Sequence, residues 1–148
     1  PANLYGPEDH FEEEKSHVIP AIIRRFVEAQ EAELEEVANW GSGTPTREFL
    51  HVRDAARGIA LAAATKTGPE PINLGTGVET SIADLTNTIA DAVGYTGTLS
   101  WDTSKPDGQP KRYLDVTRAQ KQLGFNAEVP LAAGIAETVA WYRSSLAD

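Results

Sequence analysis

Amphipathic segments of helical length alternate along the chain with a few short apolar runs, and this alternation most constrains the fold. Helices are predicted over residues 16–31, 53–66, 80–93, 116–124 and 130–146. Short strands are predicted on both sides of a turn at 41–45, in "PINLG" (71–75) and in "TLSWD" (98–102). The chain is therefore expected to be α/β, with about five helices and short strands.

The strands are too few and too widely separated for a complete doubly wound sheet of βαβ units. None of them is followed by the G-x-G-x-x-G turn that binds the pyrophosphate of a dinucleotide. At the helix ends, Ser16 is predicted to cap the first helix, with Pro20 in its first turn, and Gly94 to follow the third helix. An α/β assembly without a dinucleotide turn of its own is expected.

The net charge of −9 comes from 22 acidic and 13 basic side chains in 148 residues. Such a chain repels a phosphate backbone and an anionic bilayer alike, so no nucleic-acid or membrane partner is expected. An anionic small molecule would have to be bound by a few local Arg and Lys side chains that act against the overall field. Those basic residues are therefore candidates for a binding site.

The chain contains no cysteine, which excludes disulfides and a cysteine nucleophile and agrees with a cytoplasmic protein. No apolar run approaches the ~18 residues of a membrane span, and no export signal opens the chain. No histidine and carboxylate have a convincing ligand spacing, so no metal site is expected.

His17 lies at or just before the start of the first helix, because Pro20 must fall within the first turn. The positive end of the helix dipole favours the neutral imidazole there, which suits a general acid or base. The alternative is a plain capping or solvent-facing histidine. Arg25 falls at the border of the apolar stripe of this helix, where it either reaches a pocket or lies along the surface.

Trp40 and Arg47 flank the Gly-Ser-Gly-Thr-Pro turn. An indole and a guanidinium at this spacing can hold a sugar or base face together with a phosphate, or form a core contact beside a surface arginine. The loop "SKPDGQPKR" places Lys105, Asp107 and Arg112 in the densest basic patch of the chain. This loop is either a diphosphate-binding element or a solvated turn.

Six stretches occur in an order that resembles one enzyme family: "PANLYGP", "SHVIPAIIRRF", "WGSGTPTREFLHV", "INLGTG", "SKPDGQPKRYLDVTRA" and "TVAWY". The family is that of the GDP-L-fucose synthases, extended short-chain dehydrogenases within the NAD-dependent epimerase/dehydratase group. The resemblance implies an NADP(H)-dependent enzyme that epimerises GDP-4-keto-6-deoxy-D-mannose at C3 and C5 and reduces it at C4 to GDP-L-fucose. It spans essentially the whole chain.

The resemblance also implies roles for individual residues. His17 matches the acid that reprotonates the carbanion. The positions that match nucleotide-sugar contacts are Val18, Arg25, Trp40, Arg47, Lys105, Asp107 and Arg112. The segment matching the nicotinamide side of the cofactor site consists of Asn3, Leu4, Tyr5 and Gly6.

The family's glycine-rich turn, catalytic serine, Tyr-x-x-x-Lys pair and cysteine base have no counterpart here, since all of them precede "NLYGP" in that family. The chain is therefore expected to be the C-terminal, substrate-binding part of such an enzyme, lacking most of the Rossmann sheet and incompetent in hydride transfer alone. Residues 1–7 would end the cofactor domain, residues 8–148 would bind the substrate, and residues 48–77 would pack on the absent Rossmann domain.

Two alternatives remain open at this stage. One is a free-standing nucleotide-sugar-binding or interaction module that bears no redox half. The other is a fragment of a different extended short-chain dehydrogenase acting on a nucleotide sugar. For the main interpretation the expected partners are a GDP-sugar, an N-terminal Rossmann domain on the same or a separate chain, and a second copy in a homodimer or another self-associated form.

Overall fold

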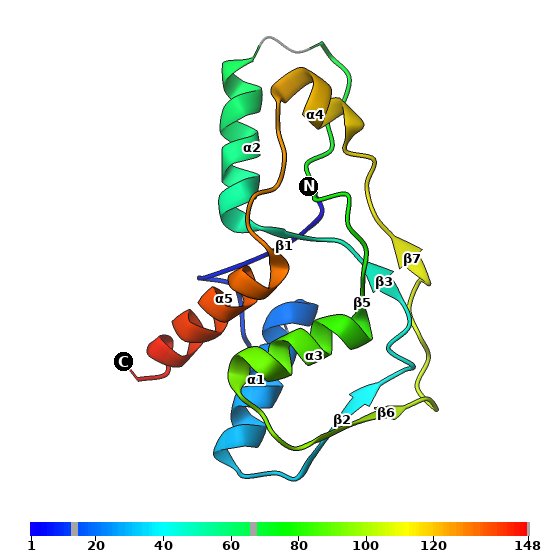
Figure 1. The fold of residues 1–148 in the computed structure, drawn as a ribbon, viewed down its shortest axis with the longest axis vertical. Helices are drawn as coiled ribbons and strands as arrows, with labels where there is room; N and C mark the ends of the chain where they lie inside the picture. The colour runs from blue at the N-terminus through cyan, green and yellow to red at the C-terminus, as the bar shows by residue number, and fades with distance from the viewer. Residues whose placement is uncertain (13–14, 66–67, 148) are drawn as a thin grey trace.

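The computed structural model describes residues 1–12, 15–65 and 68–147 of the chain (Figure 1). Its helices are α1 (Val18–Glu31), α2 (Val52–Ala64), α3 (Ile82–Val93), α4 (Thr117–Leu123) and α5 (Leu131–Ser145). Short strands connect them throughout the described residues. The prediction of an α/β fold with five helices and short strands is confirmed.

The strands form three small sheets. β1 (Asn3–Tyr5) pairs in parallel with β4 (Phe49–His51), and β2 (Glu36–Trp40) pairs in parallel with β6 (Thr98–Asp102). In the third sheet, β3 (Thr46–Arg47) lies between the antiparallel β5 (Thr80–Ser81) and the parallel β7 (Lys111–Arg112). The chain thus crosses from one sheet to another within a few residues around position 48.

Two apolar cores lie on either side of the β1–β4 pair. The larger core is built from the inner faces of α1, α3 and α5, and Phe26, Leu85 and Ile135 are fully buried in it. The smaller core joins α2 and α4 through residues such as Leu50, Leu74 and Phe125. Figure 1 shows α2 and α4 together at one end of the molecule and α1, α3 and α5 at the other.

The third helix follows the sequence prediction closely. Ser81 is the N-cap of α3, and its hydroxyl accepts a hydrogen bond from the Asp84 N–H at 2.9 Å. Gly94 ends the helix in the left-handed conformation, with φ of 79°. The first helix begins later than predicted: its N-cap is His17, which makes no side-chain capping bond, so Ser16 does not cap it. Pro20 does lie in the first turn.

The predicted strand in "PINLG" is wrong. Residues 71–75 form no strand, and the Leu74 carbonyl accepts a backbone hydrogen bond at 2.8 Å from the N–H of Ala2, the residue before β1. Leu74 is nevertheless buried, in the smaller core, which explains the apolar pattern. The loop predicted over 104–112 ends in β7, and Lys66, predicted to be helical, lies outside the described residues.

One side of α2 has no neighbour within the described residues. Its small apolar side chains Ala56, Ile59, Ala60 and Ala63 are exposed, Ile59 by 59%. The opposite side, which carries Ala55 and Gly58, is buried against the smaller core. No helix in the described ranges is long and apolar enough to cross a membrane.

Candidate functional site

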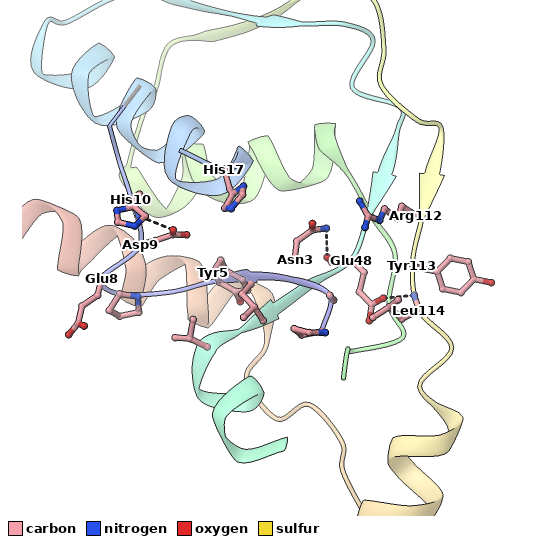
Figure 2. Close-up of a pocket in the computed structure, with 15 residues that line it drawn as sticks. Asn3, Tyr5, Glu8, Asp9, His10, His17, Glu48, Arg112, Tyr113 and Leu114 are labelled. Carbon is pink, nitrogen blue, oxygen red and sulfur yellow. Dashed lines mark hydrogen bonds between the residues drawn. The ribbon is translucent and has the colours of Figure 1, made fainter. Parts of the chain in front are cut away.

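A cavity of about 600 Å³ lies between β1, the start of α1 and the segment that contains β7 (Figure 2). Five of the residues predicted from the sequence line it: Asn3, Leu4, Tyr5, His17 and Arg112. These residues come from three separate stretches of the chain, so the fold brings the predicted cofactor-side strand, the predicted acid and one predicted substrate contact together. Asp9, His10, Glu48, Tyr113 and Leu114 also line the cavity and were not singled out by sequence reasoning.

His17 is exposed at the first turn of α1, where its carbonyl accepts the first helical hydrogen bond from Ala21 N–H at 3.0 Å. Figure 2 shows its imidazole pointing down from the helix into the cavity, across from β1 and Arg112. Because α1 begins at Val18, His17 lies just before the first helical residue rather than within the helix.

β1 forms the opposite wall. The side-chain amide of Asn3 donates to the Glu48 carbonyl at 2.9 Å, and the Leu4 side chain is 38% exposed. Tyr5 is 1% exposed, and its ring meets His51 edge-on at 5.3 Å between centroids. Burial, followed by the charges of Asp54 and Glu137, raises the Tyr5 pKa, so its phenol stays neutral. Gly6 follows β1 but does not line the cavity, and a Cβ at this position would clash with the Val52 side chain.

Arg112 supplies positive charge to the cavity. Its neighbour Lys111 is engaged in an ion pair with Glu79 at 2.7 Å, whereas the Arg112 guanidinium forms no hydrogen bond or ion pair within the described residues. Arg47 is its direct partner in the β3–β7 ladder but does not line the cavity. The Arg47 guanidinium instead donates to the carbonyls of Thr46 and Gln109, at 2.8 and 2.7 Å.

Trp40, Lys105 and Asp107 form a second group outside the cavity. Trp40 is 74% exposed, and the Lys105 Nζ lies 5.7 Å from the centre of its ring. The Asp107 carboxylate accepts from the Ser42 N–H at 2.8 Å and from the Ser42 hydroxyl at 2.7 Å. These bonds hold the pKa of Asp107 below its usual range and join the 41–44 turn to the 104–110 loop. The group offers a flat aromatic face beside a cation.

Arg25 and Val18 lie apart from both groups. The Arg25 guanidinium donates to the Asn39 side-chain oxygen at 3.2 Å, which ties α1 to β2. Val18 is half-buried and packs against the larger core. Neither residue lines the cavity.

Glu48 is the main feature that sequence reasoning missed. It is 1% exposed, lines the cavity, and accepts backbone hydrogen bonds from segments far away in the sequence. The available signal was an acidic residue followed directly by "FLHV" in a stretch predicted to be extended, which is an unusual place for an unpaired carboxylate. No group of three or more His, Asp or Glu side chains in the described ranges is placed to hold a metal ion.

The residues present fit only one end of NADP(H). Asn3 and Leu4 offer an exposed amide and an apolar side chain, whereas Tyr5 and Gly6 are buried and offer only backbone atoms. No helix in the described residues begins with a glycine-rich turn that could hold the cofactor's pyrophosphate. Among the described residues, therefore, only the Asn3–Gly6 segment is a candidate contact for the cofactor.

Comparison with known proteins defines the class. Residues 1–75 match the NAD dependent epimerase/dehydratase family, and the chain belongs to that family. Within it, the chain is similar to the GDP-L-fucose synthase of Escherichia coli K12, with 50% identity over 96% of the chain and 47% of the relative. It is 46% identical to the probable GDP-L-fucose synthase 1 of Oryza sativa subsp. japonica, over 96% of the chain and 43% of the relative.

A solved structure agrees with these relatives. The crystal structure of a GDP-L-fucose synthetase from Naegleria fowleri bound to NADP superposes with a TM-score of 0.91 and 34% identity, over 98% of this chain and 46% of that one. The fold is thus that of part of an extended short-chain dehydrogenase. The chain spans less than half the length of each of these relatives.

Proposed function

We propose that this chain forms the nucleotide-sugar-binding part of an NADPH-dependent epimerase-reductase that converts GDP-4-keto-6-deoxy-D-mannose to GDP-L-fucose. The observation that carries the proposal is the cavity in which His17, at the start of α1, lies opposite Arg112 and β1. Similarity to GDP-L-fucose synthases over almost the whole chain supports the choice of substrate.

In this proposal His17 acts as an acid. A base of the proposed N-terminal region takes the proton next to the C4 ketone and leaves a carbanion that is delocalised onto the carbonyl oxygen. The imidazole N–H of His17 then donates a proton to the opposite face of the same carbon. The centre is inverted, and the ketone is regenerated. The cofactor, when bound, supplies the hydride that reduces C4.

The remaining predicted residues hold the nucleotide. Arg47 and Arg112 are adjacent on β3 and β7, a spacing that suits the two phosphates of a diphosphate. Trp40 offers its exposed ring to the base, with Lys105 and Asp107 beside it. Arg25 and Val18, both on α1, are also assigned to the nucleotide-sugar site. Arg25 is held near Trp40 by its hydrogen bond to Asn39 in β2.

The proposed division of the chain follows the two walls of the cavity. Residues 1–7 end the strand and turn of a cofactor domain, residues 8–148 bind the substrate, and residues 48–77 pack on that cofactor domain. The exposed side of α2, within residues 48–77, supports this division. In this proposal hydride transfer uses a dinucleotide-binding region that lies outside residues 1–148.

Calorimetric titration of the purified chain tests the proposal. GDP-L-fucose and GDP are expected to bind, whereas NADPH is not, because the pyrophosphate site is incomplete. UDP-glucose is the matched control, since it offers the same diphosphate with another base and sugar, and it is expected to bind more weakly. Failure of both GDP ligands to bind would contradict the proposed function.

A further inference from the structure

Glu48 is a buried carboxylate without a cation partner among the described residues. It lies between β3 and β4, where the chain passes from one sheet to another, and is 1% exposed. A charged carboxylate is costly to bury unless hydrogen bonds replace its hydration. The hydrogen-bond partners of Glu48 therefore indicate which segments of the chain this residue fixes.

Both carboxylate oxygens accept from backbone N–H groups on other segments. Oε2 accepts from the Leu114 N–H at 2.7 Å, and Oε1 accepts from the Gly77 N–H at 2.8 Å. Leu114 follows Arg112 by two residues, so the first bond anchors the segment that carries the free guanidinium of the cavity. Figure 2 shows the Glu48 side chain directed toward Leu114, with Arg112 above it.

The backbone carbonyl of Glu48 fixes the opposite wall. It accepts from the Asn3 N–H at 3.3 Å and from the Asn3 side-chain amide at 2.9 Å. One residue thus sets the positions of Asn3 on β1 and of the segment after β7, which face each other across the cavity. Gly75 allows the close approach, because a Cβ at this position would overlap Glu48 Oε1.

We propose that Glu48 is a positioning residue that holds Arg112 in place for the anionic part of the substrate. It touches no phosphate itself; it fixes the backbone from which Arg112 extends. The inference rests on the proposed function, because it requires that Arg112 bind the nucleotide sugar. A purely structural Glu48 would instead stabilise the fold without any specific link to Arg112.

A double-mutant cycle separates these two roles. Glu48→Gln preserves the shape of the side chain and one acceptor oxygen. Its amide NH₂ must face either the Leu114 N–H or the Gly77 N–H, so one of the two hydrogen bonds is lost because both groups are donors. Affinity for GDP-L-fucose, measured by calorimetry, is expected to fall about tenfold in the otherwise unchanged chain. In an Arg112→Ala background the same substitution is expected to have almost no effect, because no guanidinium remains to be positioned. Glu35→Gln, on an exposed surface carboxylate, is the control and should leave affinity unchanged.

Equal losses of affinity with and without Arg112 would overturn the positioning role, as would an unchanged affinity of Glu48→Gln. If the chain without substitutions binds neither GDP nor GDP-L-fucose, the proposed function fails, and the positioning role fails with it. Binding by the unsubstituted chain together with an additive cycle would contradict only the role of Glu48.

Two further measurements do not depend on the folding of Glu48→Gln. In the unsubstituted protein, the amides of Leu114 and Gly77 are expected to exchange with solvent far more slowly than that of Gly108 in the exposed loop; equal rates would overturn the proposal. Gly75→Ala displaces the carboxylate and is expected to weaken GDP-L-fucose binding, whereas Gly68→Ala, which has open space around it, is not. Equal binding by these two variants would also contradict the proposal.

Discussion

Arg47 and Arg112 are paired directly across the β3–β7 ladder, yet their guanidinium groups are held differently. The Arg47 guanidinium is bonded to the carbonyls of Thr46 and Gln109 and thereby holds the 104–110 loop. The Arg112 guanidinium forms no such bond within the described ranges and lies in the cavity wall. Of these two adjacent cations, Arg47 is tied to the loop through Nη1, whereas Arg112 makes no such bond among the described residues.

Arg112→Ala is expected to weaken GDP-L-fucose binding by about ten- to a hundredfold, because a charge-assisted hydrogen bond to a phosphate contributes about 1.5–3 kcal/mol. Calorimetry measures the affinity, and the melting temperature should stay nearly unchanged because Arg112 is exposed. Arg118→Ala, on the exposed surface of α4, is the control. A similar loss of affinity in both variants would indicate a general effect of charge.

His17→Ala is expected to slow epimerisation about a hundredfold while it changes GDP-L-fucose affinity much less. The rate is measured as solvent deuterium incorporation by this chain joined to the N-terminal half of the E. coli relative, which is 50% identical over the shared region. His10→Ala removes the other exposed histidine of the cavity and serves as the control. Equal losses of rate and affinity in His17→Ala would argue for a structural histidine.

Trp40→Ala is expected to weaken GDP binding about five- to a hundredfold, since stacking of a base on an aromatic ring contributes roughly 1–3 kcal/mol. Binding of GDP should also quench tryptophan fluorescence, and Trp40→Phe should remove most of that quenching. Trp141→Phe is the matched control, because Trp141 is half-buried and stacks on Phe11 away from the nucleotide. Quenching that survives in Trp40→Phe would contradict stacking on Trp40.

Asp54 links the acid stability of the chain to the packing of α2. Burial disfavours its ionised form, but hydrogen bonds from the Val129 N–H, Arg57 and the Glu128 N–H outweigh burial and hold the Asp54 pKa below 3.8. Its stabilising contribution is complete above this ordinary value and is lost as the pH falls through the lower folded-state pKa.

Asp54→Asn is therefore expected to lower the free energy of unfolding by about 2 kcal/mol at neutral pH, with a smaller deficit below pH 3.8. Urea unfolding followed from about pH 7 to about pH 2.5 measures both effects. Asp91→Asn, on the exposed side of α3, should show neither. A deficit that does not change with pH would mean that the charge of Asp54 is not what stabilises the native state.

Local sequence signals predicted the helices well. The Ser81 cap, the apolar stripe of α3 and Gly94 are all contained within one short stretch, so the helix could be placed almost to the residue. The start of α1 was predicted too early, at Ser16 instead of Val18. Ser16 and His17 both precede the apolar stripe, and no side chain caps the helix to mark its first residue. The "PINLG" run was misread because a buried apolar run is not distinguished by pattern from a strand.

The candidate site was harder to predict because it depends on distant contacts. Glu48 binds N–H groups that lie 29 and 66 residues further along the chain, and a backbone N–H has no signature in the sequence. The sequence groups Lys105, Asp107 and Arg112 in one basic loop. Only the fold separates Arg112, in the cavity, from Lys105 and Asp107 beside Trp40.

The exposed alanine-rich side of α2 affects how the isolated chain associates in solution. An exposed helix face bearing Ile59 among alanines can bury its apolar side chains against another apolar surface. At high protein concentration the most abundant such surface is the same face of a second copy of the chain. We propose that the isolated chain self-associates along this face. Self-association of this kind would make protein concentration part of any binding measurement, because dilution would then raise the fraction of monomer.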